Sequence, residues 1–157
     1  MTPKGKMIII GGGVDKGSFT EQEFTDQVEN NLNFFEKGIL RRLLDESSNG
    51  LSSRIEIVPT ASKIPKIVGE EYAKAFRFLG AENVGVLNII SRKECENSGV
   101  IDRVKKANIV FFTGGDQLRL TSIIGGTTLH DTLINKYINE SFLYAGTSAG
   151  AACVSQQ

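Results

Sequence analysis

The sequence predicts an α/β fold: a three-layer sandwich with a mostly parallel, doubly wound sheet. Short apolar runs alternate about five times with segments in which apolar residues recur at helical spacing. The short runs are apolar throughout, which is typical of strands that helices cover on both faces. Together these observations favour a parallel sheet between two layers of helices.

The strands are expected in short, β-branched segments that end in turn residues. Residues 6–12 (KMIIIGG) are an apolar run that ends in glycines. Residues 53–62 form a second run, which Pro59 ends because proline cannot donate to a central ladder. The other strands are expected at 83–90, 108–117 and 141–146.

The helices are expected between these runs. In residues 30–47 leucines recur three and four positions apart, and the polar residues and glycine of 47–50 predict the end of that helix. Residues 65–81 begin with Pro65, which a first helical turn accepts, and have Gly80 near their end. Two further helices are expected at 99–108 and 127–141.

Length and composition suit a single α/β domain that covers residues 1–157. Lysine and arginine (18) balance aspartate and glutamate (18), so no net charge attracts nucleic acid or an anionic membrane. No apolar run approaches the ~20 residues that span a bilayer. Cys95 and Cys153 lie far apart and lack zinc-site spacing, so we expect no metal, no cofactor and a reduced, cytoplasmic protein.

Glycines and small polar residues gather where the predicted strands end. These segments are GGGVDKG (11–17), PTAS (59–62), TGGDQ (113–117) and GTSAG (146–150). Ligands of open α/β sheets bind beyond the carboxyl ends of the strands. The four segments therefore predict a functional site at that edge of the sheet.

GTSAG fits the Gly-x-Ser-x-Gly pattern of a nucleophile elbow between a strand and a helix. Such a turn would present the hydroxyl of Ser148 to the cleft, with Gly146 and Gly150 allowing close packing. The N–H of Ala149 could then donate to an oxyanion. The alternative is an ordinary glycine-rich loop with an incidental serine.

In TGGDQ, paired glycines let backbone N–H groups turn toward a ligand. The second oxyanion donor is expected from Gly115, or from Asp116, and Gln117 would hydrogen-bond substrate. The alternative is an ordinary turn in which Asp116 caps the next helix.

Other candidates are weaker. The glycines of residues 8–17 fit neither the dinucleotide-binding nor the P-loop pattern, so a tight turn near the cleft is expected there. His130 is the single histidine of the chain. Its helix is expected to run to the other end of the sheet before the last strand returns, so we do not expect His130 to reach Ser148. Cys153 is expected to be a small buried residue.

The motifs IIIGGGVDKG, IVPTAS, VFFTGGDQLRLT and GTSAGAACVS, in this order and at this spacing, resemble the serine peptidase family of the cyanophycinases and aspartyl dipeptidases. The resemblance implies a class I glutamine amidotransferase-like fold. It also implies Ser148 as nucleophile, Gly115 and Ala149 as oxyanion hole, and Gln117 with Asp116 as substrate-binding residues.

Cyanophycinases cleave cyanophycin, a poly-aspartate with arginine on each β-carboxyl, into β-Asp-Arg dipeptides. The resemblance thus implies cyanophycin, or another Asp-containing peptide, as substrate, no metal, and a cytoplasmic homodimer. In the family the catalytic histidine follows the elbow, whereas this sequence stops at Gln157. We therefore expect an N-terminal part of a larger catalytic domain, incomplete at the C-terminus and inactive by itself. An aspartyl dipeptidase, an esterase or a non-catalytic protein are the alternatives.

Overall fold

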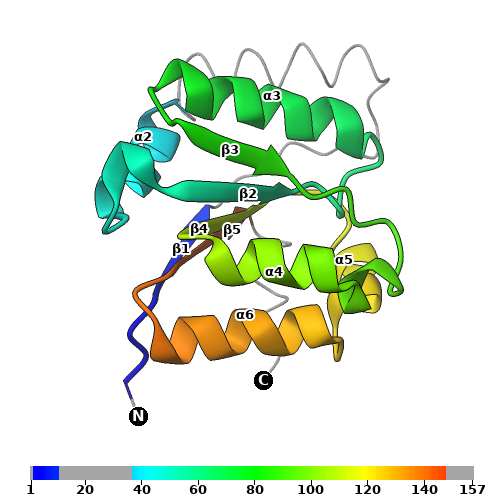
Figure 1. Cartoon of the computed structure of the whole chain (residues 1–157). Coiled ribbons are helices and arrows are strands. Elements are labelled where there is room, and N and C mark those ends of the chain that lie inside the picture. The colour runs from blue at the N-terminus through cyan, green and yellow to red at the C-terminus, as the bar shows by residue number, and fades with distance from the viewer. Residues whose placement is uncertain (1, 11–36, 148–157) are drawn as a thin grey trace.

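A computed structural model of the chain describes residues 2–10 and 37–147. The strands of this part are β1 (Lys6–Ile10), β2 (Arg54–Val58), β3 (Asn83–Val86), β4 (Ile109–Phe112) and β5 (Leu143–Thr147). They form one sheet in the order β1-β5-β4-β2-β3, and each neighbouring pair is parallel (Figure 1). The predicted α/β class with a parallel sheet is confirmed.

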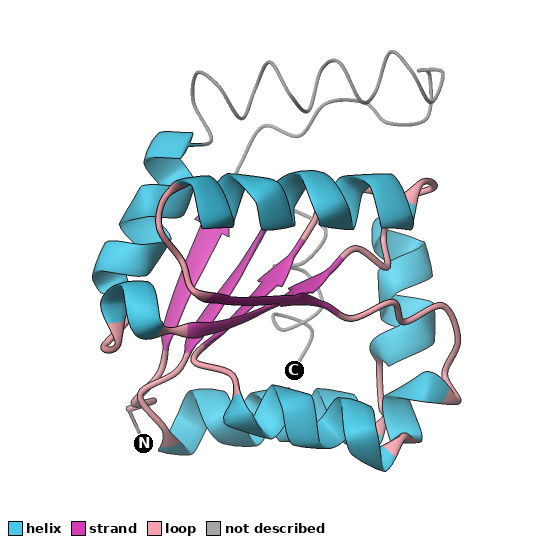
Figure 2. Ribbon diagram, turned by 45° about the horizontal axis from the view of Figure 1, so that its top comes forward, coloured by secondary structure: helices cyan, strands magenta, loops and turns pink. Residues whose placement is uncertain are grey.

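Helices cover both faces of the sheet (Figure 2). Helices α2 (Lys37–Glu46) and α3 (Pro65–Phe78) pack on one face, and α4 (Ser98–Lys106) and α6 (Thr128–Asn139) on the other. Helix α5 (Gln117–Ile124) lies at the end toward which the strands point (Figure 1). Short 3-10 turns occur at Gly50–Ser52 and Glu94–Glu96.

The two layers explain why the strands are apolar without interruption. In β4, Ile109 and Phe111 pack into the cluster under α2 and α3, whereas Val110 and Phe112 pack into the cluster under α4 to α6. Successive side chains of a strand point to opposite faces, so a strand between two helical layers needs apolar residues at every position. The ring of Phe111 lies 4.9 Å from that of Tyr72, centroid to centroid.

Three of the predicted strands, those at 53–62, 83–90 and 108–117, extend too far at their carboxyl ends. Strand β2 ends at Val58, directly before Pro59, and β3 ends at Val86. Strand β4 ends at Phe112, and residues that were expected to continue it to 117 form a turn that leads into α5. Helix α5 was not predicted as an element. It forms because Gly114 and Gly115 turn the chain and Asp116 caps the new helix.

The other predicted elements agree with the structure except at their ends. The end of α2 before Gly50, and that of α3 before Gly80, are confirmed, and both glycines have positive φ angles (53° and 101°). Residues 30–36 of the first predicted helix and the glycines of 11–17 lie outside the described residues.

Candidate functional site

The carboxyl ends of β2, β4 and β5 lie side by side. Val58 pairs with Phe112, and Phe112 pairs with Gly146. The segments that follow β2 and β4 therefore begin at the same edge of the sheet, as the sequence predicted for PTAS and TGGDQ. Ser148, Ala149 and Gly150 lie outside the described residues, so the elbow and its roles stay predictions.

Gly115 sits where no other residue fits without strain. Its φ angle is +147°, and a Cβ atom there would lie 2.2 Å from the carbonyl oxygen of Ala61. The next residue, Asp116, donates its N–H to that same oxygen at 2.9 Å. The turn after β4 thus packs backbone to backbone against the loop after β2, and only glycine permits this approach.

This packing separates the two oxyanion donors that the sequence left open. The N–H of Asp116 is already used by Ala61. The N–H of Gly115 has no hydrogen bond to any residue that the structure describes. Gly115 is therefore the donor of the two that is available to a ligand.

Asp116 and Gln117 begin α5. One carboxylate oxygen of Asp116, Oδ1, accepts from the N–H groups of Leu118 (2.9 Å) and Arg119 (3.1 Å), which is the geometry of a helix N-cap. The capping role weighed for Asp116 is thus confirmed, and its contact with substrate stays a prediction. Gln117 is exposed, and its side-chain amide has no hydrogen bond within the described ranges.

Hydrogen bonds hold the loop after β2 in place. Pro59 accepts from the N–H of Ser62 at 3.0 Å, and the hydroxyl of Thr60 donates to the carbonyl of Ile89 at 2.8 Å. The guanidinium of Arg119 donates through Nε to the carbonyl of Thr60 at 2.9 Å. Residues 59–62 thus form a turn directly after β2. Arg119 was not predicted as a site residue, although a cation in the first turn of a helix at this edge could have indicated it.

Thr113 is a buried polar residue at this edge. It follows β4 directly, its side chain is 0% exposed, and its hydroxyl has no hydrogen-bond partner among residues 2–10 and 37–147. Buried hydroxyls are nearly always paired, so an unpaired one beside the Gly114–Gly115 turn distinguishes this edge as a candidate site.

His130 lies at the same end of the sheet as these loops. Helix α6 runs against the direction of the strands and therefore begins beside their carboxyl ends (Figure 1). As expected, α6 runs to the other end of the sheet and β5 then returns, so the start of α6 and the end of β5 lie at the same edge. The Nδ1 of His130 accepts from the N–H of Gly126 at 3.0 Å, and its buried Nε2 has no partner in the described part of the chain. Whether His130 reaches Ser148 is not tested, and the prediction that it does not stays a prediction.

The model of peptidase family S51 matches residues 32–157. The chain belongs to peptidase family S51. This agrees with the serine peptidase family that the four motifs indicate.

Relatives within family S51 cover much of this chain. A cyanophycinase of Trichormus variabilis is 41% identical over 98 residues, which are 62% of this chain and 33% of that protein. A cyanophycinase of Geminocystis herdmanii is 35% identical over 116 residues, which are 74% of this chain and 42% of that protein. The chain thus spans less than half the length of these two relatives.

Two solved structures have a similar fold. A peptidase from an acI-B1 Actinobacterium superposes with a TM-score of 0.58 at 20% identity, covering 73% of this chain and 49% of that one. A putative Peptidase E protein from Listeria monocytogenes superposes with a TM-score of 0.53 at 26% identity, covering 70% and 54%. Both likenesses agree with the predicted class I glutamine amidotransferase-like fold.

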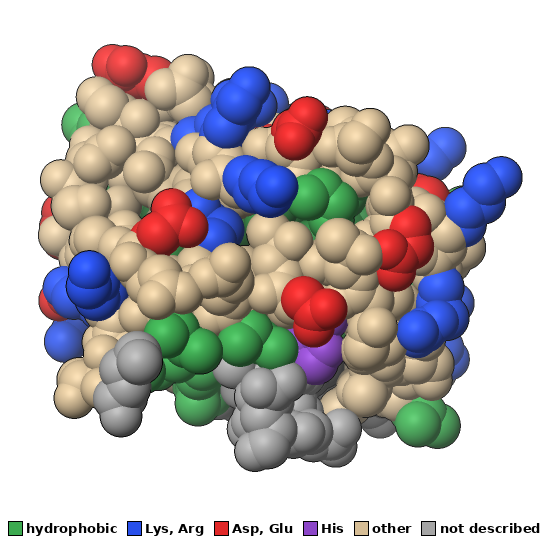
Figure 3. Space-filling view, turned by 60° about the horizontal axis from the view of Figure 1, so that its bottom comes forward, with side chains coloured by type: hydrophobic (Ala, Val, Ile, Leu, Met, Phe, Trp, Pro, Cys, Tyr) green, Lys and Arg blue, Asp and Glu red, His purple; other side chains and the backbone are tan. Residues whose placement is uncertain are grey.

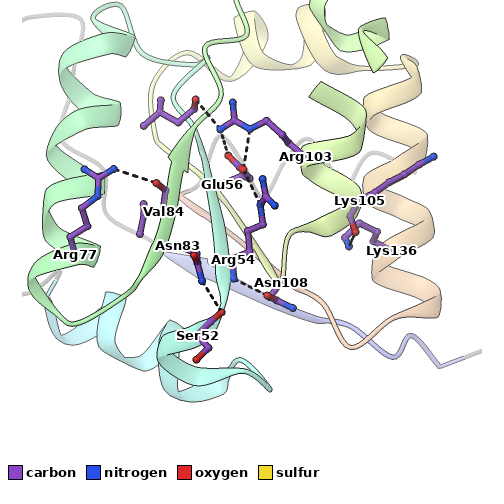
Figure 4. Close-up of polar contacts among 11 residues, drawn as sticks. Ser52, Arg54, Glu56, Arg77, Asn83, Val84, Arg103, Lys105, Asn108 and Lys136 are labelled. Atoms are coloured by element: carbon purple, nitrogen blue, oxygen red, sulfur yellow. Dashed lines mark hydrogen bonds and ion pairs between the residues drawn. The ribbon is translucent and has the colours of Figure 1, made fainter. Parts of the chain in front are cut away.

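A second polar cluster is centred on Glu56, the middle residue of β2, and extends through Arg54 to the amino end of that strand (Figure 4). Glu56 is 2% exposed, and Arg103 donates to both of its carboxylate oxygens, at 3.1 and 2.6 Å. Arg54 adds a second cation 3.7 Å from the carboxylate. Gly85 leaves room for the pair, since a Cβ there would lie 2.6 Å from Arg103 Nη2. The cluster lines a hollow of about 600 Å³, but its carboxylate is fully engaged.

Charge is mixed over the face of the molecule that α6 forms, where acidic and basic side chains are interspersed (Figure 3). Among the described residues, no group of three or more His, Cys, Asp or Glu side chains could hold a metal ion. A search of the same residues found no helix long and apolar enough to cross a membrane.

Proposed function

We propose that this protein is a serine peptidase of family S51 that degrades cyanophycin to β-Asp-Arg dipeptides, with Ser148 as nucleophile. The observation that supports it most directly is Gly115. Its backbone, in a conformation that other residues adopt only with strain, packs against Ala61, and its N–H has no partner among the described residues. It lies beside the strand that leads to Ser148. The cyanophycinases among its relatives support the choice of substrate.

In the proposed reaction, the hydroxyl oxygen of Ser148 attacks the carbonyl carbon of the scissile peptide bond while a base takes its proton. The N–H groups of Gly115 and Ala149 donate to the oxyanion that forms. The proton passes to the leaving amine, and water then hydrolyses the acyl-enzyme and restores the serine. Gln117, exposed at the start of α5, would hydrogen-bond the peptide, with Asp116 beside it.

Family resemblance supports the remaining parts of the proposal. We propose that residues 1–157 are the N-terminal part of a single α/β catalytic domain, and that the base is a histidine of the sequence after Gln157. The isolated chain would then release little dipeptide. By the same resemblance, the protein would be a cytoplasmic homodimer that needs no metal.

The test is the variant Ser148→Ala in the protein expressed from its full reading frame. Release of β-Asp-Arg from cyanophycin should fall at least about 10³-fold, because loss of a nucleophile leaves only binding and oxyanion stabilisation. Ser98→Ala is the matched control, since Ser98 is exposed at the start of α4. Unchanged release from Ser148→Ala would rule out the assigned nucleophile.

An aspartyl dipeptidase is the second candidate, favoured by the likeness to a putative Peptidase E at 26% identity. A panel of cyanophycin, Asp-X dipeptides and p-nitrophenyl esters separates the two peptidases from an esterase. A non-catalytic protein would form no covalent adduct with a serine-reactive phosphonate, whereas the proposed enzyme would form one at Ser148.

A further inference from the structure

Arg119 lies in the first turn of α5, three residues after Asp116. Its Nε donates to the carbonyl of Thr60 at 2.9 Å, so its side chain reaches across to the loop after β2. Ala61, the next residue of that loop, contacts Gly115 and accepts from Asp116. Arg119 and Gly115 therefore contact adjacent residues, Thr60 and Ala61, of one short loop. This brings the guanidinium close to the candidate oxyanion donor.

Among the described residues, the guanidinium of Arg119 has a hydrogen-bond partner only for its Nε. Its Nη1 and Nη2 groups form no hydrogen bond, and no carboxylate forms an ion pair with it, within the part of the chain that the structure describes. The nearest acidic residue in the sequence, Asp116, uses Oδ1 to cap α5. Arg119 itself is exposed.

Arg103 provides a comparison, because its guanidinium lies next to a carboxylate of the same fold. It donates through Nε and Nη2 to the two oxygens of Glu56, the planar fork that suits a carboxylate. The single bond of Arg119 to Thr60 fixes the guanidinium through Nε and leaves the end-on pair of Nη donors pointing away from that bond. A held guanidinium with two free donors is preorganised for a carboxylate that is not part of the fold.

We propose that Arg119 is a substrate-binding residue that holds a carboxylate of the aspartyl peptide through its two Nη groups. The proposal rests on the proposed function for its substrate class. A β-Asp-Arg unit has two carboxylates, the α-carboxylate of aspartate and the carboxylate of arginine, and either has the required chemistry. Gln117, two residues earlier and also exposed, would contact the same unit.

Two variants separate ligand binding from a purely structural tether to Thr60. In Arg119→Gln the side-chain nitrogen stands at the same number of bonds from the backbone as Arg Nε. It can keep the hydrogen bond to Thr60 while both Nη groups are lost. Arg119→Met removes the hydrogen bond as well. Arg92→Gln is the matched control, because Arg92 is an exposed arginine that also donates to backbone carbonyls, those of Ser122 and Gly125.

The experiment measures binding of β-Asp-Arg to the full-length protein by calorimetry, together with two analogues in which one or the other carboxylate is a carboxamide. We expect Arg119→Gln to raise the Kd of the dipeptide about tenfold, as the loss of a charge-assisted hydrogen bond predicts. One of the two carboxamide analogues should bind to the wild type as weakly as to Arg119→Gln. The carboxylate that this analogue lacks is then the one that Arg119 holds. On cyanophycin, Arg119→Gln should raise KM and leave kcat within about twofold, whereas Arg119→Met should also lower kcat.

An unchanged Kd in Arg119→Gln would overturn the assignment and leave the peptidase proposal intact. So would a fall in kcat with unchanged KM in both variants, which a structural tether predicts. The peptidase proposal fails separately, if Ser148→Ala still releases dipeptide. Because dipeptide binding does not depend on turnover, the role of Arg119 is tested in either case.

Discussion

At the middle of β2, the buried carboxylate of Glu56 receives two hydrogen bonds from Arg103, and Arg54, the first residue of that strand, stands beside it (Figure 4). At the carboxyl ends of β2 and β4, the buried hydroxyl of Thr113 has no partner among the described residues, and neither has the N–H of Gly115, which is exposed. A folded chain nearly always pairs its buried polar groups. Groups left unpaired are therefore expected where a ligand completes them, and groups that are paired are expected to serve the fold.

We expect opposite effects from substitutions in these two regions. Changes around Glu56 should alter the free energy of unfolding and leave the kinetics of the folded enzyme unchanged. Changes at the carboxyl end should alter kinetics by more than their effect on stability explains.

The largest effect is expected from Gly115→Ala. Its Cβ would lie 2.2 Å from the carbonyl oxygen of Ala61, at a φ of +147°. The turn must shift, and the proposed oxyanion donor shifts with it. We expect kcat to fall about 10²-fold or more and the free energy of unfolding to fall by more than about 1 kcal/mol.

Gly38→Ala is the control for that variant. Gly38 lies in α2, and nothing stands within 4 Å of a Cβ placed on it. Alanine there should stabilise the helix by up to about 1 kcal/mol and leave kcat unchanged. If Gly115→Ala kept wild-type kcat, the turn after β4 would have no part in the reaction.

Of the changes around Glu56, Arg103→Met should lower the free energy of unfolding most. It leaves Glu56, which is 2% exposed, without its two-donor partner. Breaking a fully buried ion pair on one side costs about 3–5 kcal/mol. The loss here should be smaller, because the side chain of Arg103 is 39% exposed and Arg54 lies near the same carboxylate. Urea unfolding measures it, and kcat and KM should not change while the protein is folded.

The double variant Arg103→Met with Glu56→Met tests the cause of that loss. Removing both partners also removes the unpaired buried charge, so the double variant should be more stable than Arg103→Met alone. A double variant less stable than the single one would mean that Glu56 stabilises the fold by contacts other than this pair.

Asp116, a proposed site residue, and Asn97, a structural residue, cap their helices with the same geometry and can therefore be compared directly. Asp116 Oδ1 accepts from N–H groups at 2.9 and 3.1 Å at the start of α5, and Asn97 Oδ1 does so at the same two distances in α4. Replacing either by alanine should cost about 1 kcal/mol of stability. Only Asp116→Ala should also change kcat or KM, because Asp116 stands between Gly115 and Arg119. Equal kinetics for both variants would mean that Asp116 serves only as a helix cap and has no part in the reaction.

The order of the elements could be predicted from the sequence, but the points at which strands end could not. Leu87 and Ile89 are 2% and 1% exposed, although they follow the last residue of β3. Hydrophobicity follows burial, whereas a strand ends where its ladder of hydrogen bonds ends. The apolar run at 83–90 therefore predicted a strand that continues past Val86.

The site could be predicted only as far as local sequence determines it. Glycine pairs after strands identified the correct edge of the sheet. The choice between Gly115 and Asp116 depends on Ala61, and the position of Arg119 depends on Thr60. Both contacts join segments far apart in the chain, which no local pattern reveals. Helix α5 was expected only in the alternative that makes Asp116 a helix cap, and that cap is local, since Asp116 accepts from Leu118 and Arg119.

The smallest predicted effect concerns Lys136, a buried cation near the amino end. Its side chain donates to the carbonyl of Lys105 at 2.7 Å and lies 4.9 Å from the centre of the Phe142 ring (Figure 4 shows Lys105 and Lys136). Burial lowers the pKa of Lys136, and Glu140 opposes this only in part. The unfolded chain therefore binds more protons than the folded one between the folded-state pKa of Lys136 and about 10.4.

In that alkaline interval, the contribution of Lys136 makes the free energy of unfolding rise with pH. Below it, Lys136 is charged in both states and the cost of burying the charge is present in full. Lys136→Met should remove this rise, and the exposed Lys105→Met should keep it. The pKa of the Cys95 thiol is raised by burial and gives the opposite slope, but all three proteins share Cys95, so it cancels in the difference. Urea unfolding at a series of pH values measures that difference. A curve for Lys136→Met parallel to that of the wild type would show that Lys136 folds without a cost of desolvation.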